Sequence, residues 1–399
     1  EKAKIQLLTH QGDSSMNINL WVNELSNRFS SGSGGASPKF GIGQIDMRNS
    51  SFALVNFNSE PISEGLDYNR MRFEDISISA SEFYLDGGEI GIKIAHMVGL
   101  ESGSGLNIKE FRTDFIYSPR FMEFANLKLA TNESHIKDFL RLEYSSVSAF
   151  SEFITEVTIN ANMKETTLGL GDLRFFAPTL PDIQDELVIT GNFTGPVSEI
   201  KTDEFILRLG EKTEVFGSIL LDGLPEIENT YINLSLQNST LDSKDLSPYL
   251  PESSKTEVLK FGTIRLSSNF RGFLDRFDTD GDFRTSIGNV SGRIRYENQN
   301  GKNEVVSRVD VENFNLGILT DQRETFQKIS LSGTVEAEGK SLDDLLLDLD
   351  ANVSNFGLLG YNYTGIQTDA KYGLELFEGN ISINDPNLKL NGGGSINLK

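Results

Sequence analysis

Apolar and polar residues alternate from Lys328 to Leu398, a pattern that the rest of the chain repeats more loosely. Successive side chains of a β-strand point to opposite faces of a sheet, so this alternation predicts strands with one apolar and one polar face. Near the end of the chain the apolar positions are Ile381, Ile383, Leu388, Leu390, Ile396 and Leu398. The polar positions of the same segment are Ser382, Asn384, Lys389, Asn391 and Asn397. Asp385-Pro386-Asn387 between them predicts a turn.

The same alternation runs from Phe40 to about Leu129, broken by short turn-forming segments. For example, Ile90, Ile92 and Ile94 alternate with other residues after the turn signal Asp86-Gly87-Gly88. Similar strands resume from Val157 onwards. Strands at short spacing with turns between them are typical of a β-meander.

Two segments predict helices instead. Ser15–Phe29 places five apolar residues on one helical stripe, namely Ile18, Trp21, Val22, Leu25 and Phe29. A Ser/Gly-rich joint follows at residues 30–35. Residues 134–156 are ambiguous between strand and helix, and the spacing of Val147, Phe150 and Ile154 favours a short helix over Ser148–Glu156.

These patterns predict three parts: an N-terminal helix and flexible joint at 1–35, a β-meander at 36–133, and a repeating β-segment at 134–399. In the third part, Asn192–Ile200 resembles Asn269–Phe277 and, more weakly, Glu336–Leu345. In each, a strand ends at glycine and a short segment with acidic and apolar residues follows. The uneven spacing suits an array in which a unit of a few strands recurs. Because the chain starts without Met and ends on a strand-like segment, we expect an internal fragment of a longer protein.

Charge and composition narrow the possible partners. The chain has 58 acidic and 36 basic residues, a formal net charge of −22, so a nucleic acid would be repelled and is not an expected partner. It has no cysteine, which excludes a disulfide-stapled scaffold and a thiolate metal site. No apolar run approaches the roughly 18 to 20 residues of a membrane-spanning helix.

The candidate chemical motifs favour structural roles. The aspartates of Asp278-Thr279-Asp280-Gly281-Asp282 are similar to those of a calcium-binding loop. An EF-hand loop, however, needs glycine at its sixth position and a bidentate acid at its twelfth, where this chain has Phe283 and Asn289. We therefore expect a turn or crossover here. Gly392-Gly393-Gly394 lacks the Lys-Ser/Thr and helix of a phosphate loop. The three histidines are far apart in sequence. We therefore expect no catalytic residue, no metal site, no cofactor and no enzymatic activity.

Several segments resemble the TamB family, the translocation and assembly module proteins of Gram-negative envelopes, within the AsmA-like group. The segments that carry the resemblance are Val215–Thr230, Gly272–Phe277 with Gly281 and Thr285–Gly288, Val309–Gly317, and Tyr361–Tyr363 through Phe377–Gly379 to Asn384–Asn387. The similarity covers roughly residues 130 to 399 and is fainter before that. Most of these motifs consist of residues that end or interrupt strands.

The family is similar in architecture to bridge-like lipid transfer proteins. The resemblance therefore implies an all-β fold: an elongated, twisted, mainly antiparallel sheet folded into a taco-like hydrophobic groove, with a few short covering helices. It implies a periplasmic, non-enzymatic module through which phospholipid acyl chains pass. In the full-length protein an N-terminal segment would anchor the protein in the inner membrane. A C-terminal region would engage an outer-membrane barrel protein of the TamA type. Neither region is visible in this sequence.

An alternating apolar face fits either an open groove or the filled core of a β-sandwich, since both need the same residues. With the resemblance, the groove is the leading hypothesis, and a structural or adhesive β-sandwich surface protein is the alternative. A glycan-cleaving parallel β-helix enzyme is weakest, because regular rungs and a convergent acid or Arg/Lys cluster are missing. The predicted groove lining is Ile264, Leu266, Val309, Val311, Ile329, Leu331, Val335, Leu347, Leu349, Val353, Ile381, Ile383, Leu388 and Leu390.

Overall fold

The structure is a computed structural model that describes residues 2–13, 16–17, 39–86, 88–175, 178, 185–341, 344–373 and 376–397. It separates into two compact units, Glu1–Gly210 (unit 1) and Glu211–Lys399 (unit 2). Apart from Met16 and Asn17, the helix predicted at 15–29, whose apolar stripe begins at Ile18, and the Ser/Gly joint lie outside the described residues. The three-part division of the chain stays a prediction.

In unit 1 each strand pairs with the next strand along the chain. The pairing is antiparallel except between the first two strands, which are parallel. The strands are β1 (Lys4–Thr9), β2 (Phe40–Asn56), β3 (Arg70–Asp86), β4 (Glu89–Glu101), β5 (Asn107–Ser118), β6 (Phe121–Ala130), β7 (His135–Glu143), β8 (Thr158–Gly169), β9 (Glu186–Gly195) and β10 (Glu199–Leu209). The short helices of this unit are η1 (Val147–Glu152), α2 (Phe153–Glu156) and α3 (Leu170–Leu173).

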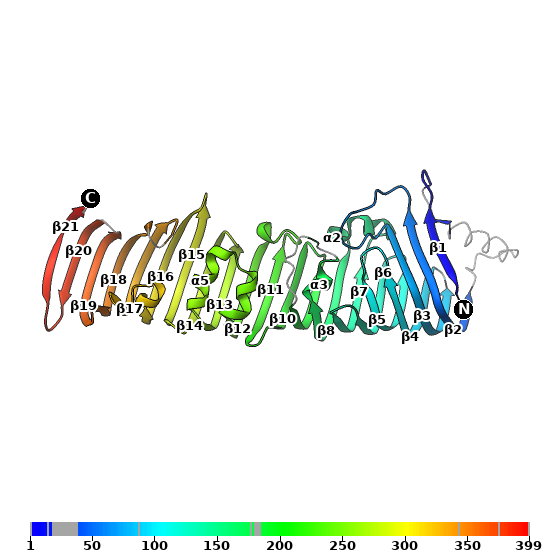
Figure 1. Ribbon diagram of the computed structural model, residues 1–399, viewed down its shortest axis with the longest axis horizontal. Coiled ribbons are helices and arrows are strands. Elements are labelled where there is room, and N and C mark those ends of the chain that lie inside the picture. Colours follow the sequence, from blue (N-terminus) through cyan, green and yellow to red (C-terminus); the bar gives the residue numbers. More distant parts are fainter. Residues whose placement is uncertain are drawn as a thin grey trace. The chain divides into compact units, whose positions relative to one another are not determined.

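Unit 2 is an antiparallel meander in which the strands follow one another from β11 to β21, green to red in Figure 1. Its strands are β11 (Thr213–Asp222), β12 (Tyr231–Asp242), β13 (Thr263–Phe273), β14 (Arg276–Thr285), β15 (Gly288–Gln299), β16 (Lys302–Asn315), β17 (Phe326–Gly339), β18 (Leu346–Leu358), β19 (Tyr361–Gly373), β20 (Leu376–Asn384) and β21 (Lys389–Asn397). Its helices are η2 (Ile227–Asn229), α4 (Ser243–Leu246), η3 (Ser247–Tyr249), α5 (Glu252–Lys260) and α6 (Leu316–Leu319).

The expected all-β, mainly antiparallel fold with a few short helices is therefore confirmed. The antiparallel pairing also contradicts a parallel β-helix, in which successive rungs would run in one direction.

The helix predicted at Ser148–Glu156 is confirmed as η1 followed by α2. Ala149 packs in a small core with Tyr144 and Val157, where Ala149 and Val157 are fully shielded from solvent. The Tyr144 hydroxyl donates a hydrogen bond to the carbonyl oxygen of Ser118 over 2.8 Å. Burial raises the pKa of Tyr144 to about 12, so this phenol stays neutral at physiological pH.

The two turn predictions in unit 2 have different outcomes. The turn at Asp385-Pro386-Asn387 is confirmed, because these residues join β20 to β21. The turn or crossover expected at Asp278–Asp282 is wrong, because the whole segment lies inside β14. Its three aspartates alternate with Thr279 and Gly281 along the strand, and Gly281 lies in the strand interior.

That glycine belongs to a row of directly opposed positions, rich in glycine and other small residues, that crosses unit 2. Directly opposed positions on successive strands form the glycine row: Gly217, Leu236, Ser268, Gly281, Gly292, Val309, Gly333, Ala351, Thr368, Ile381 and Gly392. At Gly292 the backbone φ is +133°, and a Cβ atom would collide with the carbonyl oxygen of Arg308 and lie 2.9 Å from the Cα of Val309. Strand glycines of this kind mark a bend or a close approach of neighbouring strands.

Gly292→Ala should therefore destabilise the protein by about 2 kcal/mol, because alanine meets both the unfavourable φ and the neighbouring backbone. Gly394→Ala is the matched control: it lies in β21, and nothing stands within 4 Å of its Cβ position. The control should change the free energy of unfolding by less than about 0.5 kcal/mol. Urea unfolding of both variants measures the difference, and equal effects would contradict a close backbone approach at Gly292.

Candidate functional site

The strand registers of unit 2 align apolar residues into rows beside the glycine row. One row runs from β13 to β21 through Leu266, Phe283, Val290, Val311, Leu331, Val353, Ile366, Ile383 and Leu390. On the other side of the glycine row, a row from β11 to β21 contains Ile219, Leu234, Phe270, Thr279, Ile294, Ser307, Val335, Leu349, Ala370, Gly379 and Gly394. The next contains Leu221, Ile232, Gly272, Phe277, Tyr296, Val305, Ala337, Leu347, Tyr372, Phe377 and Ile396. These three rows and the glycine row together form one surface of four rows, which we call the apolar face of unit 2.

The structure brings nearly all of the predicted lining onto this face. The four rows contain Leu266, Val309, Val311, Leu331, Val335, Leu347, Leu349, Val353, Ile381, Ile383 and Leu390. Ile264 and Ile329 lie two residues before Leu266 and Leu331 on the same strands, and therefore on the same face. Leu388 is the exception, because it lies in the turn before β21.

Exposure varies across the apolar face. Residues of the central rows are buried, as Val309 and Val353 show with 7% and 4% of their surface exposed. On β21, Leu390 and Ile396 are 46% and 54% exposed. Many residues between these extremes are half-buried, among them Leu331, Val335 and Leu349. The face therefore retains accessible apolar surface, which a fully packed core would not leave.

Unit 1 has an apolar face of the same construction. One row crosses β4 to β9 through Ile92, Phe115, Phe124, Leu140, Ala161 and Phe193. A second runs beside it through Ile90, Tyr117, Met122, Leu142 and Ile159. The rings of Phe115 and Phe124 stand 5.0 Å apart, so cross-strand aromatic pairs help to hold this face together.

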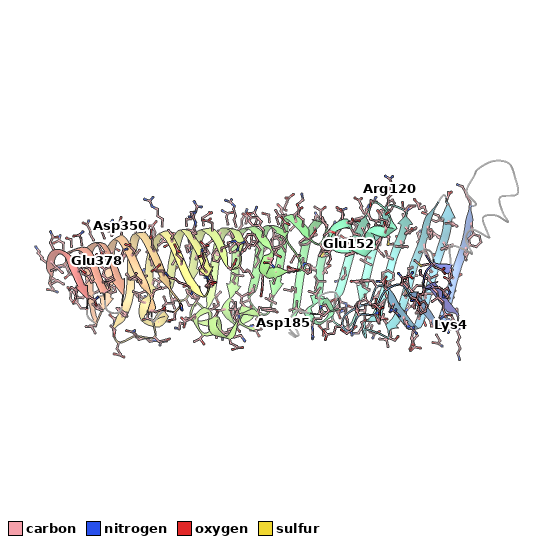
Figure 2. All side chains as sticks on the ribbon, turned by 90° about the horizontal axis from the view of Figure 1, so that it is seen from above. Lys4, Arg120, Glu152, Asp185, Asp350 and Glu378 are labelled. Carbon is pink, nitrogen blue, oxygen red and sulfur yellow. The ribbon has the colours of Figure 1, made fainter. Side chains whose placement is uncertain are left out.

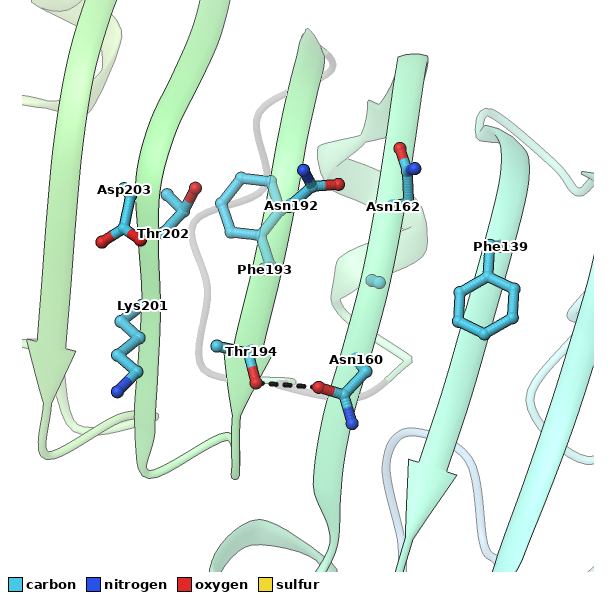
Figure 3. Close-up of a pocket in the computed structure, with 10 residues that line it drawn as sticks. Phe139, Asn160, Asn162, Asn192, Phe193, Thr194, Lys201, Thr202 and Asp203 are labelled. Atoms are coloured by element: carbon cyan, nitrogen blue, oxygen red, sulfur yellow. Dashed lines mark hydrogen bonds between the residues drawn. The ribbon is translucent and has the colours of Figure 1, made fainter.

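In both units the opposite face of the sheet is polar. In unit 2 it includes Asp350 and Glu378, labelled in Figure 2. In unit 1, Asn160, Asn162, Asn192 and Thr194 line a hollow of about 330 Å³ (Figure 3). The Thr194 hydroxyl donates to Oδ1 of Asn160 over 2.8 Å. These neutral amides and hydroxyls can form hydrogen bonds, but the hollow contains no histidine and no paired carboxylates suited to acid–base catalysis.

Buried carboxylates in the structure hold turns together. Asp385 is 1% exposed and accepts hydrogen bonds from the backbone N–H groups of Asn387 and Thr364 and from the Tyr361 hydroxyl, at 2.9, 3.0 and 2.7 Å. These donors, the Asn387 N–H foremost, lower the pKa of Asp385 below its ordinary value. Asp242 is likewise held ionised, with its pKa lowered chiefly by the Thr263 hydroxyl that donates to it over 2.7 Å.

Within the described residues, no group of three or more His, Asp or Glu side chains is placed to hold a metal ion. In the same part of the chain, no helix is long and apolar enough to cross a membrane. Comparisons with protein-family models, with curated proteins and with solved structures found no match. The two opposite faces are therefore the features from which a function can be argued.

Sequence reasoning missed the glycine row. The available signal was a glycine between polar residues in the middle of an alternating segment, as in Asp280-Gly281-Asp282, Ser291-Gly292-Arg293 and Ser332-Gly333-Thr334. Only the strand register shows that these glycines lie in one row.

The pKa of Asp385 gives a prediction about pH. Because its pKa is lowered in the folded state, the ionised carboxylate stabilises the fold above about pH 4, and this contribution is lost as the pH falls through the folded-state pKa. Asp385→Asn should lower the stability at neutral pH, and its difference from the wild type should shrink on acidification. Tyr361→Phe, which removes one donor, should show the same trend more weakly. Urea unfolding across a pH series measures both, and a difference independent of pH would contradict the role of the carboxylate.

Proposed function

We propose that this chain is a non-enzymatic module that holds phospholipid acyl chains along the apolar faces of its sheets. The observation that carries the proposal is the continuity of the apolar face of unit 2: three of its rows extend from β11 to β21 and the fourth from β13 to β21, and none contains a charged residue. Acyl chains have no hydrogen-bonding groups, so a mainly apolar surface without charged residues suits them.

The energetics favour such binding. Moving a methylene group from water to an apolar surface contributes about 0.8 kcal/mol, so a lipid tail can be held by apolar contact alone. A trough would increase that contact. The glycine row supports a trough, because glycines that permit close strand approach along one line allow a sheet to fold about that line. The polar lipid headgroups would remain at the solvent-exposed opening of the trough.

The cellular setting of the proposal rests on the resemblance to the TamB family. It places the chain in the periplasm of a Gram-negative cell, as part of a bridge that supports phospholipid transport and outer-membrane assembly. The inner-membrane anchor and the contact with an outer-membrane barrel protein of the TamA type would belong to regions outside this chain.

A structural or adhesive β-sandwich protein is the second candidate. The burial of central residues such as Val309, Ala351 and Val353 favours it, because closed cores bury their residues in the same way. The two candidates differ in what a charge on the apolar face should do. In a trough it repels the ligand, whereas in a closed core it destabilises the fold.

The test compares two substitutions on neighbouring residues of β20. Ile383 belongs to the apolar face, and Ser382 lines a hollow on the polar face. We expect Ile383→Asp to reduce the phospholipid that co-purifies with the protein, because a carboxylate in contact with acyl chains must be desolvated. Ser382→Asp adds the same charge to the same strand and should leave the lipid content unchanged. Native mass spectrometry and lipid extraction of the full chain measure the outcome.

Thermal unfolding of both variants in parallel separates loss of binding from loss of fold. The trough requires Ile383→Asp to lose lipid while keeping a cooperative unfolding transition. A wild-type protein without co-purifying phospholipid, or an Ile383→Asp variant that simply unfolds, would instead favour the closed core.

A further inference from the structure

Three cations stand directly opposite one another on the polar face of unit 1. Arg112 on β5 opposes Lys128 on β6, and Lys128 opposes Lys137 on β7. Directly opposed side chains have Cβ atoms about 5 Å apart, and like charges at that spacing destabilise a sheet. All three are exposed, and among the described residues none of these side chains forms an ion pair or donates a hydrogen bond. We call them the basic row.

The carboxylates nearby are already engaged. Arg112, Lys128, Lys137 and Lys164 line a hollow of about 450 Å³ together with Asp114 and Asp138. Asp138 forms an ion pair with Lys164 at 3.1 Å. Asp114 accepts a hydrogen bond from the Asn126 amide over 2.7 Å. Four cations against two carboxylates leave this hollow positive, although the whole chain carries a net charge of −22.

The local backbone is also irregular. The strand register shifts beside the basic row in three successive pairs, β5–β6, β6–β7 and β7–β8. Asn126 and Asp138 adopt positive φ angles of 52° and 95° at these irregularities. Bulges redirect side chains and are frequent beside binding sites. Here they accompany the hollow between the strands.

Opposed cations also occur in unit 2, and only some of them are neutralised: Arg265 on β13 opposes Arg284 on β14, and neither forms an ion pair among the described residues. Arg293 and Arg308 also stand opposite each other, on β15 and β16. Arg293 forms an ion pair with Asp278 at 3.0 Å and has Asp280 directly opposite on β14. Unlike Arg293, the basic row has no ion-pair partner among the described residues, and it brings three cations to one hollow, where their charge is available to a ligand.

We propose that the basic row binds a phosphate group, either as free phosphate or as the headgroup of a lipid. A tetrahedral oxyanion can accept hydrogen bonds from several donors at once, and the Arg112 guanidinium can form a bidentate pair with it. Its negative charge would also relieve the repulsion among the three cations. The site lies on the face opposite the apolar face, so it does not depend on acyl-chain binding.

The first experiment titrates the full chain with inorganic phosphate by calorimetry at constant ionic strength. Lys128→Gln, at the centre of the row, should weaken phosphate binding about tenfold, and the triple variant Arg112→Gln, Lys128→Gln, Lys137→Gln should abolish it. The control triple variant Arg293→Gln, Lys302→Gln, Lys371→Gln changes the net charge equally but removes exposed, ion-paired cations. It should retain binding, and an equal loss in both triple variants would overturn the site.

Stability gives a second readout that is independent of affinity. Without phosphate at low ionic strength, Lys128→Gln should raise the midpoint of thermal unfolding, because it removes two like-charge contacts. Phosphate should raise the midpoint of the wild type more than that of the variant. A midpoint that Lys128→Gln lowers, or that phosphate shifts equally in both, would count against the proposal.

Vesicle flotation distinguishes the two sources of phosphate. Vesicles of phosphatidylcholine with phosphatidic acid should bind the wild type but not the basic-row triple variant if the ligand is a headgroup. Calorimetric binding of inorganic phosphate without flotation assigns the site to free phosphate. If wild-type protein binds neither inorganic phosphate nor these vesicles, the proposal is wrong.

Discussion

The antiparallel strand register is the constraint on which both faces of this protein depend. Side chains alternate along each strand, so a slip of one residue between two neighbours would move apolar residues onto the polar face. The register avoids this even where the strands are irregular. Between β16 and β17 it shifts by one residue, yet Val311 opposes Leu331 and Phe314 opposes Ile329. The bulge at Asn313, with φ of 51°, thus keeps the apolar face continuous.

Most strands, and which of their residues share a face, could be predicted from the sequence, because a period of two is a local property. Strand β14 was the exception, since a turn or crossover was expected at Asp278–Asp282. The alternation along a single strand was enough to predict that Leu347 and Leu349 share a face, and likewise Ile381 and Ile383. Leu388 lies outside these strands, because the turn after Asp385 extends to it. The glycine row and the basic row could not be found in this way, because each joins residues on different strands. Their alignment depends on bulge positions, which the apolar pattern does not encode.

The apolar face also limits how the protein can be stabilised. The half-buried residues of this face gain part of their shielding from lateral neighbours in the same sheet. Cross-strand aromatic contacts supply part of it, such as Phe270 with Phe277 at 4.7 Å and Phe277 with Tyr296 at 5.1 Å. Turns are fixed separately by buried carboxylates such as Asp385. The excess of acidic residues opposes association between copies through their exposed apolar surface.

Because each strand contributes to both faces, two chemistries can occupy one sheet without sharing a residue. In β5, Phe111 and Phe115 face the apolar side, whereas Arg112 belongs to the basic row. A substitution on one face then leaves the side chains of the other in place, provided that the backbone register is kept. The anomaly of the basic row is therefore informative: nothing in the packing of the apolar face requires three cations to stand together behind it. Since their repulsion destabilises the sheet, a ligand on the polar face is the simplest physical reason for placing them there.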